Sequence, residues 1–233
     1  MKIKSLFIAF CSIFLIGCTS QQKADESQIN MFDGKSLGKW QVSDFFAGGK
    51  VYVKDGAIVI EKSSTGGYMQ GINWTGPLIK MDYEITLEAM RVDGSDFFCG
   101  LTFPVGDSPC TLILGGWGGT LCGLSSLDSY DASENETTTF IDFNQNQWYK
   151  VRLKVTSHRI QAWLDEEPLV DVDTIGKSID IRFECIPCLP LGIATYNTTG
   201  AIRNIKVQKI EEKSDSIKNY EEDQIFLQSN RFK

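Results

Sequence analysis

The sequence of 233 residues is poor in histidine, and this excludes several kinds of active site. Its one histidine, His158, cannot form a site with several histidine ligands or an acid–base pair of histidines. No Ser-His-Asp order and no Cys-His pair is evident, and the E-x-D-x-x-E pattern of some glycosidases is absent. Catalysis by this chain therefore has to be sought among its carboxylates.

Basic residues are also in short supply. Lysine and arginine number 23 against 30 acidic residues, so the net charge is −7. Removal of residues 1–17 takes away Lys2 and Lys4, so the charge falls further, from −7 to −9. This excess of acid disfavours nucleic acid and anionic lipid as partners. Neutral ligands fit the charge, and sugars are the obvious class.

The cysteines do not suit a scaffold held together by disulfides. Besides Cys11 and Cys18 the chain has five, an odd number that cannot all pair: Cys99, Cys110, Cys122, Cys185 and Cys188. Cys185 and Cys188 have the spacing of metal ligands, but the sequence contains no second C-x-x-C. We expect these thiols to be buried or unpaired, and one or two bridges in an exported protein are the alternative.

Long apolar runs are absent apart from one at the N-terminus. A basic start is followed by apolar residues 6–16, fewer than the roughly 20 that span a bilayer. The run ends at Leu15-Ile16-Gly17-Cys18, which resembles a bacterial lipobox, in which the cysteine is lipidated. We expect a signal peptide at 1–17, a lipid on Cys18 and a polar tether over 18–29. The alternative is a plain secretory signal or an uncleaved anchor.

These features predict an exported protein that is anchored by lipid to the bacterial cell envelope and faces the periplasm or the surface. Contact with the membrane is expected through the anchor only.

Alternation of apolar and polar residues dominates the rest of the chain. Residues 81–89 and 148–156 alternate strictly, and Asp55-Gly56 separates two apolar pairs, which is typical of a hairpin. Further short strands are predicted at 97–103, 111–114, 159–164, 168–172, 191–196 and 202–207. No long amphipathic helix is evident before residue 212. The sequence therefore predicts one all-β sandwich or barrel over 30–211, followed by a charged tail over 212–233.

Three charged residues form the first candidate for a catalytic cluster. Asp96 follows the strand that contains Glu88 and Arg91, and we expect both of these on or near its polar side. If this face of the sheet is concave, the cluster can bind or act on a ligand. The alternative is a solvated face with surface ion pairs.

A glycine-rich run supplies a candidate aromatic platform. Trp117 stands between Gly116 and Gly118 within the run Gly115–Gly119. Glycine permits unusual backbone dihedral angles and close approach of a ligand, so Trp117 could stack on the face of a sugar ring. The alternative is a tryptophan packed over a tight turn.

An acidic loop supplies the remaining candidates. Asp128, Asp131, Glu134 and Asn135 are rich in oxygen atoms that could bind sugar hydroxyls or a hard cation, so the loop is a candidate site for a divalent cation. A polar surface loop is the alternative. Arg182 and its neighbour Glu184 form a charge pair that could face the same cleft.

The order of segments resembles the 3-keto-disaccharide hydrolase domain family over about residues 31–210. The segments are "FDGKSL" with a later Trp (32–40), "DYEITLEAMR" (82–91), "GSDFFCGLTFPV" (94–105), "GGWGG" (115–119), "DASENETT" (131–138), "WYKVRLKV" (148–155), "RIQAWLDEEPL" (159–169) and "LGIATYNTTGAIRNIKV" (191–207). The resemblance implies a concanavalin-like jelly-roll sandwich. It also implies lyase or hydrolase activity on 3-keto-glycosides.

The implied chemistry is a β-elimination. A ketone at C3 acidifies the hydrogen on C2, a base removes it, and the glycosidic oxygen leaves C1. Such a site needs a base, a positive group or metal near the C3 oxygen, and an acid for the leaving group. Two other functions stay open: a lectin-like protein that binds carbohydrate without cleaving it, which the shortage of histidine favours, and a structural envelope protein that only shares the fold.

Overall fold

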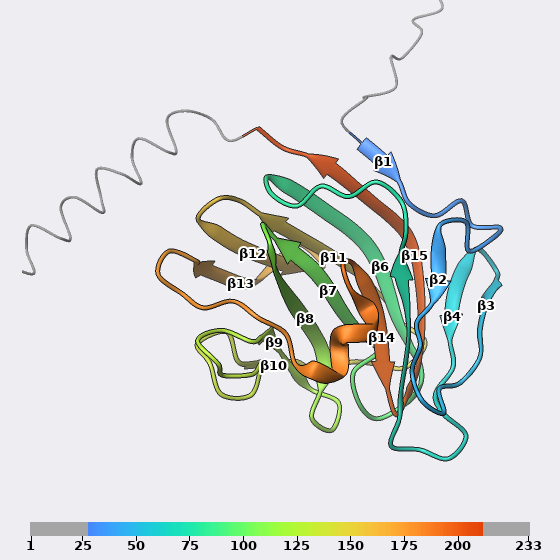
Figure 1. Cartoon of the computed structure of the whole chain (residues 1–233). Helices are drawn as coiled ribbons and strands as arrows, with labels where there is room; N and C mark the ends of the chain where they lie inside the picture. The colour runs from blue at the N-terminus through green and yellow to red at the C-terminus, as the bar shows by residue number, and fades with distance from the viewer. Residues whose placement is uncertain (1–27, 212–233) are drawn as a thin grey trace, which may run out of the picture.

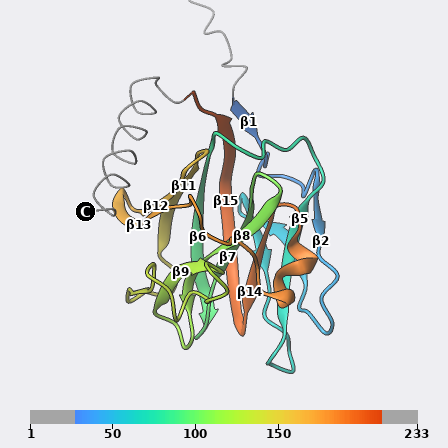
Figure 2. The same ribbon diagram turned by 60° about the vertical axis from the view of Figure 1, so that its left-hand side comes forward.

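The computed structural model describes residues 28–211, which form two antiparallel β-sheets packed face to face (Figures 1 and 2). In order across sheet A lie β13 (Glu167–Asp173), β12 (Arg159–Leu164), β11 (Trp148–Val155), β6 (Tyr83–Gly94), β15 (Thr198–Lys209), β4 (Ala57–Ile60) and β3 (Val51–Lys54), and β1 (Gln28–Asn30) also pairs with β15. In order across sheet B lie β10 (Thr139–Phe140), β9 (Leu121–Ser125), β8 (Ser108–Gly116), β7 (Cys99–Val105), β14 (Gly192–Tyr196), β5 (Met69–Trp74) and β2 (Trp40–Val42). The all-β jelly-roll fold expected from the sequence is confirmed.

The alternating segments form the core between the sheets, as their pattern predicts. On β6, Ile85 and Leu87 are buried, and they lie opposite Leu153 and Val151 of β11. Each strand contributes every second side chain to this core, because successive side chains of a strand point to opposite faces. The predicted hairpin at Asp55-Gly56 is also present, between β3 and β4.

Several strands of sheet B have no counterpart among the predicted ones. β5 and β9 have short sequences, MQGINW and LCGLS, in which both faces are buried. The outward positions of β5, β9 and the neighbouring β14 include small residues such as Gly71, Gly123 and Ala194 rather than charged ones. A strand of this kind lacks the alternation of apolar and polar residues that identifies a half-exposed strand.

The N-terminal boundary also differs from the prediction. Gln28 and Ile29 were expected in the flexible tether, but they lie in β1 and pair with Gln208 and Val207. β15 extends beyond its pairing with β4, and there it pairs with the chain two residues before the predicted domain starts.

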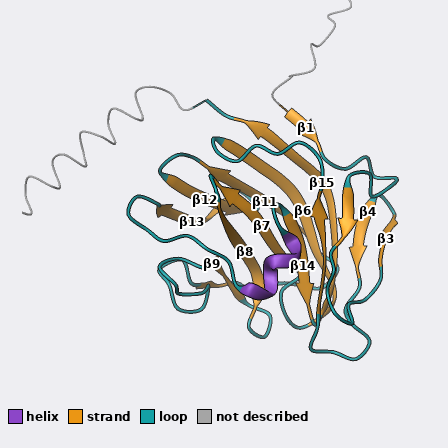
Figure 3. Ribbon diagram, viewed as in Figure 1, coloured by secondary structure: helices purple, strands orange, loops and turns teal. Residues whose placement is uncertain are grey.

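A short 3₁₀ helix lies on the outer face of sheet B. This helix, η1 (Phe183–Cys188), contacts β5 and β14 and is drawn in purple in Figure 3. It buries Cys185 and Cys188 beneath it. All five cysteines within the described residues are free thiols, as expected, and burial raises the pKa of Cys188 to about 12.

Residues 28–211 contain no helix with the length and apolar character needed to cross a bilayer. The predicted signal peptide, the lipid-bearing Cys18 and the charged tail over 212–233 lie outside the described residues.

Candidate functional site

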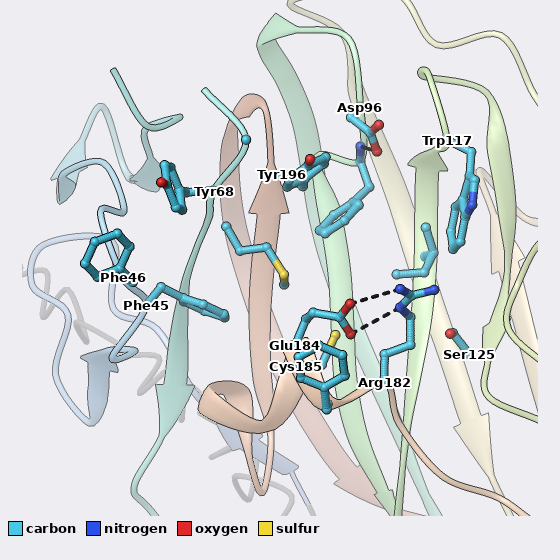
Figure 4. A pocket seen from close by; sticks show the side chains of 15 residues that line it. Phe45, Phe46, Tyr68, Asp96, Trp117, Ser125, Arg182, Glu184, Cys185 and Tyr196 are labelled. Carbon is cyan, nitrogen blue, oxygen red and sulfur yellow. Dashed lines mark hydrogen bonds and ion pairs between the residues drawn. The ribbon is translucent and has the colours of Figure 1, made fainter. Parts of the chain in front are cut away.

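A cavity of about 680 Å³ opens on the outer face of sheet B, beside η1. Aromatic side chains dominate its lining: Phe45, Phe46, Tyr68, Phe97, Trp117, Phe183 and Tyr196. Figure 4 shows Trp117 at one end and Phe45, Phe46 and Tyr68 at the other, with Tyr196 between them. The volume and the mainly apolar lining are typical of a site for a small organic ligand.

Trp117 is held in the cavity wall by a tight turn between β8 and β9. Its backbone has φ = 46°, in the left-handed region that a bulky residue rarely adopts, and its side chain is 45% exposed. The flanking Gly118 donates its N–H to Asp96 at 3.1 Å, and Gly116 accepts a hydrogen bond from Gly119. The predicted platform therefore lies in the cavity, and Gly116 and Gly118 support it through their backbone.

Arg91 supports this turn from behind and does not face the cavity. It is only 6% exposed, and its guanidinium donates to the carbonyl oxygens of Asp96, Gly115 and Gly119 at 3.2, 3.2 and 2.7 Å. It also stacks on Phe98. The expectation that Arg91 lies on the polar side of its strand is wrong, because it shares the inward phase of the core residues of β6.

Glu88 is on the polar side of β6 as expected, but that side is the outer face of sheet A, away from the cavity. Its carboxylate accepts hydrogen bonds from Arg203 and Asn204, both at 2.8 Å. Burial alone would raise the pKa of Glu88, but these two hydrogen bonds outweigh it and lower the pKa. Glu88 is thus part of an ion pair on sheet A, and its position does not fit a role in this cavity.

Asp96 is the predicted catalytic residue that does line the cavity. It lies between β6 and β7, and its two carboxylate oxygens accept backbone N–H groups from Phe97 at 2.8 Å and Gly118 at 3.1 Å. Thr198 fixes the backbone of Asp96 through its hydroxyl. These contacts hold the carboxylate in one orientation beside the Trp117 turn.

Arg182 contributes a positive charge to the same end of the cavity. Figure 4 shows it paired with Glu184, at 2.9 Å. It also pairs with Asp131 at 2.7 Å, and its guanidinium carbon lies 6.0 Å from the centre of the Trp117 ring. The hydrogen bond from Arg182 lowers the pKa of Glu184, and the same hydrogen bond raises the pKa of Arg182. The predicted Arg182–Glu184 pair therefore does face the cleft.

No residue of the acidic loop lines the cavity; the loop contacts it indirectly, through the ion pair between Asp131 and the lining residue Arg182. Burial tends to raise the pKa of Asp131, but hydrogen bonds from Ser133 and the charge of Arg182 lower it overall. Asn135 donates to the carbonyl oxygens of Leu124 in β9 and Asp131 in the loop. Asp128 accepts the N–H of Ser178, and Glu134 is exposed outside the cavity. Hydrogen bonds within the loop and to neighbouring segments therefore fix its conformation.

A metal centre is not assembled by these carboxylates. Within residues 28–211 no group of three His, Cys, Asp or Glu side chains is arranged to hold a cation. Asp131 is instead paired with Arg182, and Asp128 with Lys177 and the backbone N–H of Ser178.

Several cavity residues have no counterpart among the predicted ones. Ser125, at the end of β9, is 1% exposed, and its hydroxyl has no hydrogen-bond partner among the described residues. Phe46, Tyr68 and Tyr196 come from three segments that are far apart in the sequence. No local sequence motif identifies them as cavity residues. In the structure the exposed Phe46 and Tyr68 form an edge-to-face pair with ring centres 5.5 Å apart.

Comparison with known proteins identifies the family of the chain. The chain matches the sequence profile of the 3-keto-alpha-glucoside-1,2-lyase-like domain over residues 27–208. The chain therefore belongs to the 3-keto-alpha-glucoside-1,2-lyase-like domain family, and the resemblance found in the sequence is confirmed. No curated protein matches the chain in sequence.

Solved structures with the same fold are remote in sequence. A candidate glycosyl hydrolase from Parabacteroides distasonis has a TM-score of 0.51 at 14% identity, covering 80% of this chain and 95% of that one. Domain 4 of the arabinanase AbnA from Geobacillus stearothermophilus, solved with arabinotriose, has a TM-score of 0.51 at 15% identity, with coverage of 78% and 91%. The Crh5 transglycosylase has a TM-score of 0.55 at 11% identity, with coverage of 79% and 85%. At these identities the likeness establishes the sandwich fold alone.

Proposed function

We propose that this protein cleaves 3-keto-glycosides in the cavity of sheet B by removing the proton on C2. The observation that carries the proposal is the position of Asp96. Among the described residues, Asp96 and Glu184 are the carboxylates that line the cavity. Glu184 is paired with Arg182, whereas Asp96 is held by backbone N–H groups and keeps lone pairs free for a proton.

The remaining groups at this end of the cavity fit the other parts of the reaction. Trp117 offers its ring to a sugar face. Arg182 uses three of its five N–H donors on Asp131 and Glu184, so two stay free of partners among the described residues. Ser125 offers a hydroxyl that has no partner there. Arg182 and Ser125 can therefore bind sugar oxygens, and Arg182 can stabilise negative charge on the C3 oxygen.

The reaction proceeds in two steps. Asp96 takes the proton from C2, and the electrons of the C–H bond move to the C3 oxygen, where Arg182 stabilises the enolate. The electrons then return to form the C1–C2 double bond as the bond from C1 to the glycosidic oxygen breaks. The leaving oxygen takes a proton from water, Asp96 returns its own proton to the resulting hydroxide, and the other product is an unsaturated 3-keto sugar. An unoxidised glycoside has no acidic C2 hydrogen and should not react.

Substitution of Asp96 tests the proposal. Asp96→Asn keeps the size and the acceptor for one N–H but removes the base, so turnover of a 3-keto-disaccharide should fall about 100-fold or more, in the range that general-base catalysis contributes. Binding of the substrate should change much less. The assay is release of the leaving sugar, with Asp107→Asn as the control, because Asp107 is a highly exposed aspartate outside the cavity lining. Unchanged turnover in Asp96→Asn would remove Asp96 from the mechanism.

Carbohydrate binding without cleavage is the second candidate function. The observation in its favour is that Glu184 and Asp131 are both neutralised by Arg182, which leaves the cavity with few groups for acid–base work. Binding of the 3-keto-disaccharide with no release of the leaving sugar by the wild-type protein would support this function over the enzymatic one.

We further propose that the protein is a lipoprotein of the cell envelope, anchored through Cys18. The support is the sequence around Cys18, with Gly17 before it and Leu15 three positions before it. Cys18→Ala should abolish both incorporation of labelled fatty acid and recovery of the protein in the membrane fraction. A wild-type protein that incorporates no lipid would contradict the proposal.

A further inference from the structure

The two ends of the cavity differ in chemistry. The end at Trp117 contains Asp96, Arg182 and Ser125, which together offer a carboxylate, a guanidinium and a hydroxyl (Figure 4). A sugar ring needs such groups, because its hydroxyls lose their hydrogen bonds to water when it binds. This end therefore suits the glycosyl unit that reacts.

The opposite end is built from aromatic and apolar side chains. Phe45, Phe46, Tyr68 and Met69 line it, and the Tyr68 hydroxyl is the one polar side-chain group that they offer. Phe45 packs closely over the backbone of β5, where a Cβ at Gly71 would lie only 3.1 Å from its ring. The glycine thus lets the ring lie against the sheet and widens the apolar surface.

The rim at this end carries rings that the described residues leave exposed. Phe46 is 81% exposed and Tyr68 is 37% exposed, and the two rings stand edge to face with centres 5.5 Å apart. Neither contributes to the core between the sheets. Exposed aromatic rings that converge on one cavity mark a ligand surface, because a soluble protein otherwise tends to keep such rings apart or buried.

On the basis of the proposed function, we infer that the apolar end binds the leaving group and that this group is an aromatic ring, as in a phenolic glycoside, rather than a second sugar. The cavity of about 680 Å³ lies within the range that accommodates ligands of several rings. A second sugar at Phe45, Phe46 and Tyr68 would have several hydroxyls but only one polar side chain to bind them. A phenyl ring needs no such partners, and it can pack edge to face or offset against all three aromatic rings.

The acidity of the leaving group favours the same substrate class. The apolar end has no carboxyl, ammonium or imidazole group among the described lining residues to protonate a leaving oxygen. A phenol has an acidity like that of the tyrosine side chain, about 10 on the pKa scale, whereas an alcohol is closer to water at about 15.7. A phenolate can therefore leave C1 without an acid catalyst, which a sugar alkoxide needs.

The test compares two substrates that share a 3-keto-glucosyl group, one with phenol and the other with glucose as the leaving group. Phenol is the better leaving group with any catalyst. The informative quantity is therefore the ratio of kcat/KM for the phenyl compound to kcat/KM for the disaccharide, and how a substitution changes this ratio. We expect Phe46→Ala and Tyr68→Ala each to lower this ratio by about tenfold. Phe140→Ala, an exposed phenylalanine outside the cavity, should leave the ratio unchanged.

Binding to the full-length Asp96→Asn protein separates this inference from the proposed function. We expect calorimetry to give a dissociation constant for the phenyl compound about tenfold below that for the disaccharide. Tighter phenyl binding without any turnover by the wild-type protein would refute the proposed cleavage but support the aromatic site. Equal or tighter binding of the disaccharide, or equal loss of both activities in Phe46→Ala, would overturn the inference.

Discussion

Trp117 has a backbone conformation that a side chain of its size rarely adopts. A φ of 46° costs a bulky residue free energy, and such a conformation persists only where the surrounding structure holds it in place. Here the hydrogen bond from Gly118 to Asp96 and the three bonds from Arg91 to backbone carbonyls hold the turn. The same contacts that fix the Trp117 ring therefore also orient the Asp96 carboxylate.

Loss of the Trp117 ring should weaken binding of the sugar rather than the fold. The side chain is 45% exposed, so Trp117→Ala removes little from the core, while a stacked ring contributes about 1 kcal/mol or more to a ligand. We predict that the dissociation constant for a 3-keto-glucoside rises about tenfold. Isothermal calorimetry measures it, and Trp163→Ala is the matched control, because Trp163 packs under Arg152 on sheet A. An unchanged constant in Trp117→Ala would place the sugar elsewhere.

The residues around Trp117 also show which features of the site a local sequence pattern can predict. The glycine run and Asp96 were recognisable because each has an unusual local composition. Arg91 was misplaced, although the signal was present: it continues the alternating phase of Tyr83 to Ala89, so the pattern itself points it inward. Arg91 is an exception to the usual exposure of arginine, because its charge is satisfied by three backbone carbonyl oxygens.

At the scale of elements, η1 and the acidic loop meet through Arg182. This residue precedes η1, and it contacts Glu184 within the helix and Asp131 in the loop after β9. The two ion pairs thus connect two segments that border the cavity. Because all three side chains are partly exposed, we expect the network to fix geometry more than it stabilises the fold.

The contribution of this network to stability should depend on pH in one direction. The pKa values of Asp131 and Glu184 are lowered in the folded protein, so their stabilisation is present above the ordinary carboxylate range near 4 and is lost as the pH falls through the lowered values. Arg182→Ala should therefore melt below the wild type at pH 7, and the difference should shrink towards pH 2. Thermal unfolding at both pH values measures this.

The control for this prediction is Arg203→Ala, which breaks an ion pair with Glu88 on the other sheet. Both variants should lose their difference from the wild type in acid, but only Arg182→Ala should also weaken binding of a 3-keto-glucoside. A melting temperature of Arg182→Ala that differs from the wild type equally at both pH values would contradict the account of the ion pairs.

At the scale of the whole molecule, sheet A was more predictable than the cavity. The strands of sheet A have a polar face and an apolar face, and this alternation is visible in the sequence of β6 and β11. Sheet B is covered on its outer face by η1 and by the cavity residues, and β5 and β9 carry no charged residue on either side. Their sequences therefore lack the period of two that identifies a strand.

The cavity itself could be predicted only in part, because its walls come from distant segments. Trp117, Asp96 and Arg182 stood out from their local sequence, whereas Phe46 and Tyr68 are ordinary aromatic residues in loops. Only the pairing of β2 with β5 and of β5 with β14 brings these loops to the face that carries Trp117. Such pairings join residues far apart in the chain, and no local pattern specifies them.

Loss of the C2 hydrogen is the most direct test of the central claim, elimination from a 3-keto-glycoside. The full-length protein is incubated with a 3-keto-disaccharide that carries deuterium at C2, and mass spectrometry follows the deuterium while the leaving sugar is quantified. The account predicts one deuterium lost from the sugar for each leaving group released, at a slower rate than with the unlabelled substrate. Release of the leaving sugar with deuterium still at C2 would contradict the mechanism, since it would mean cleavage at C1 without removal of the C2 proton.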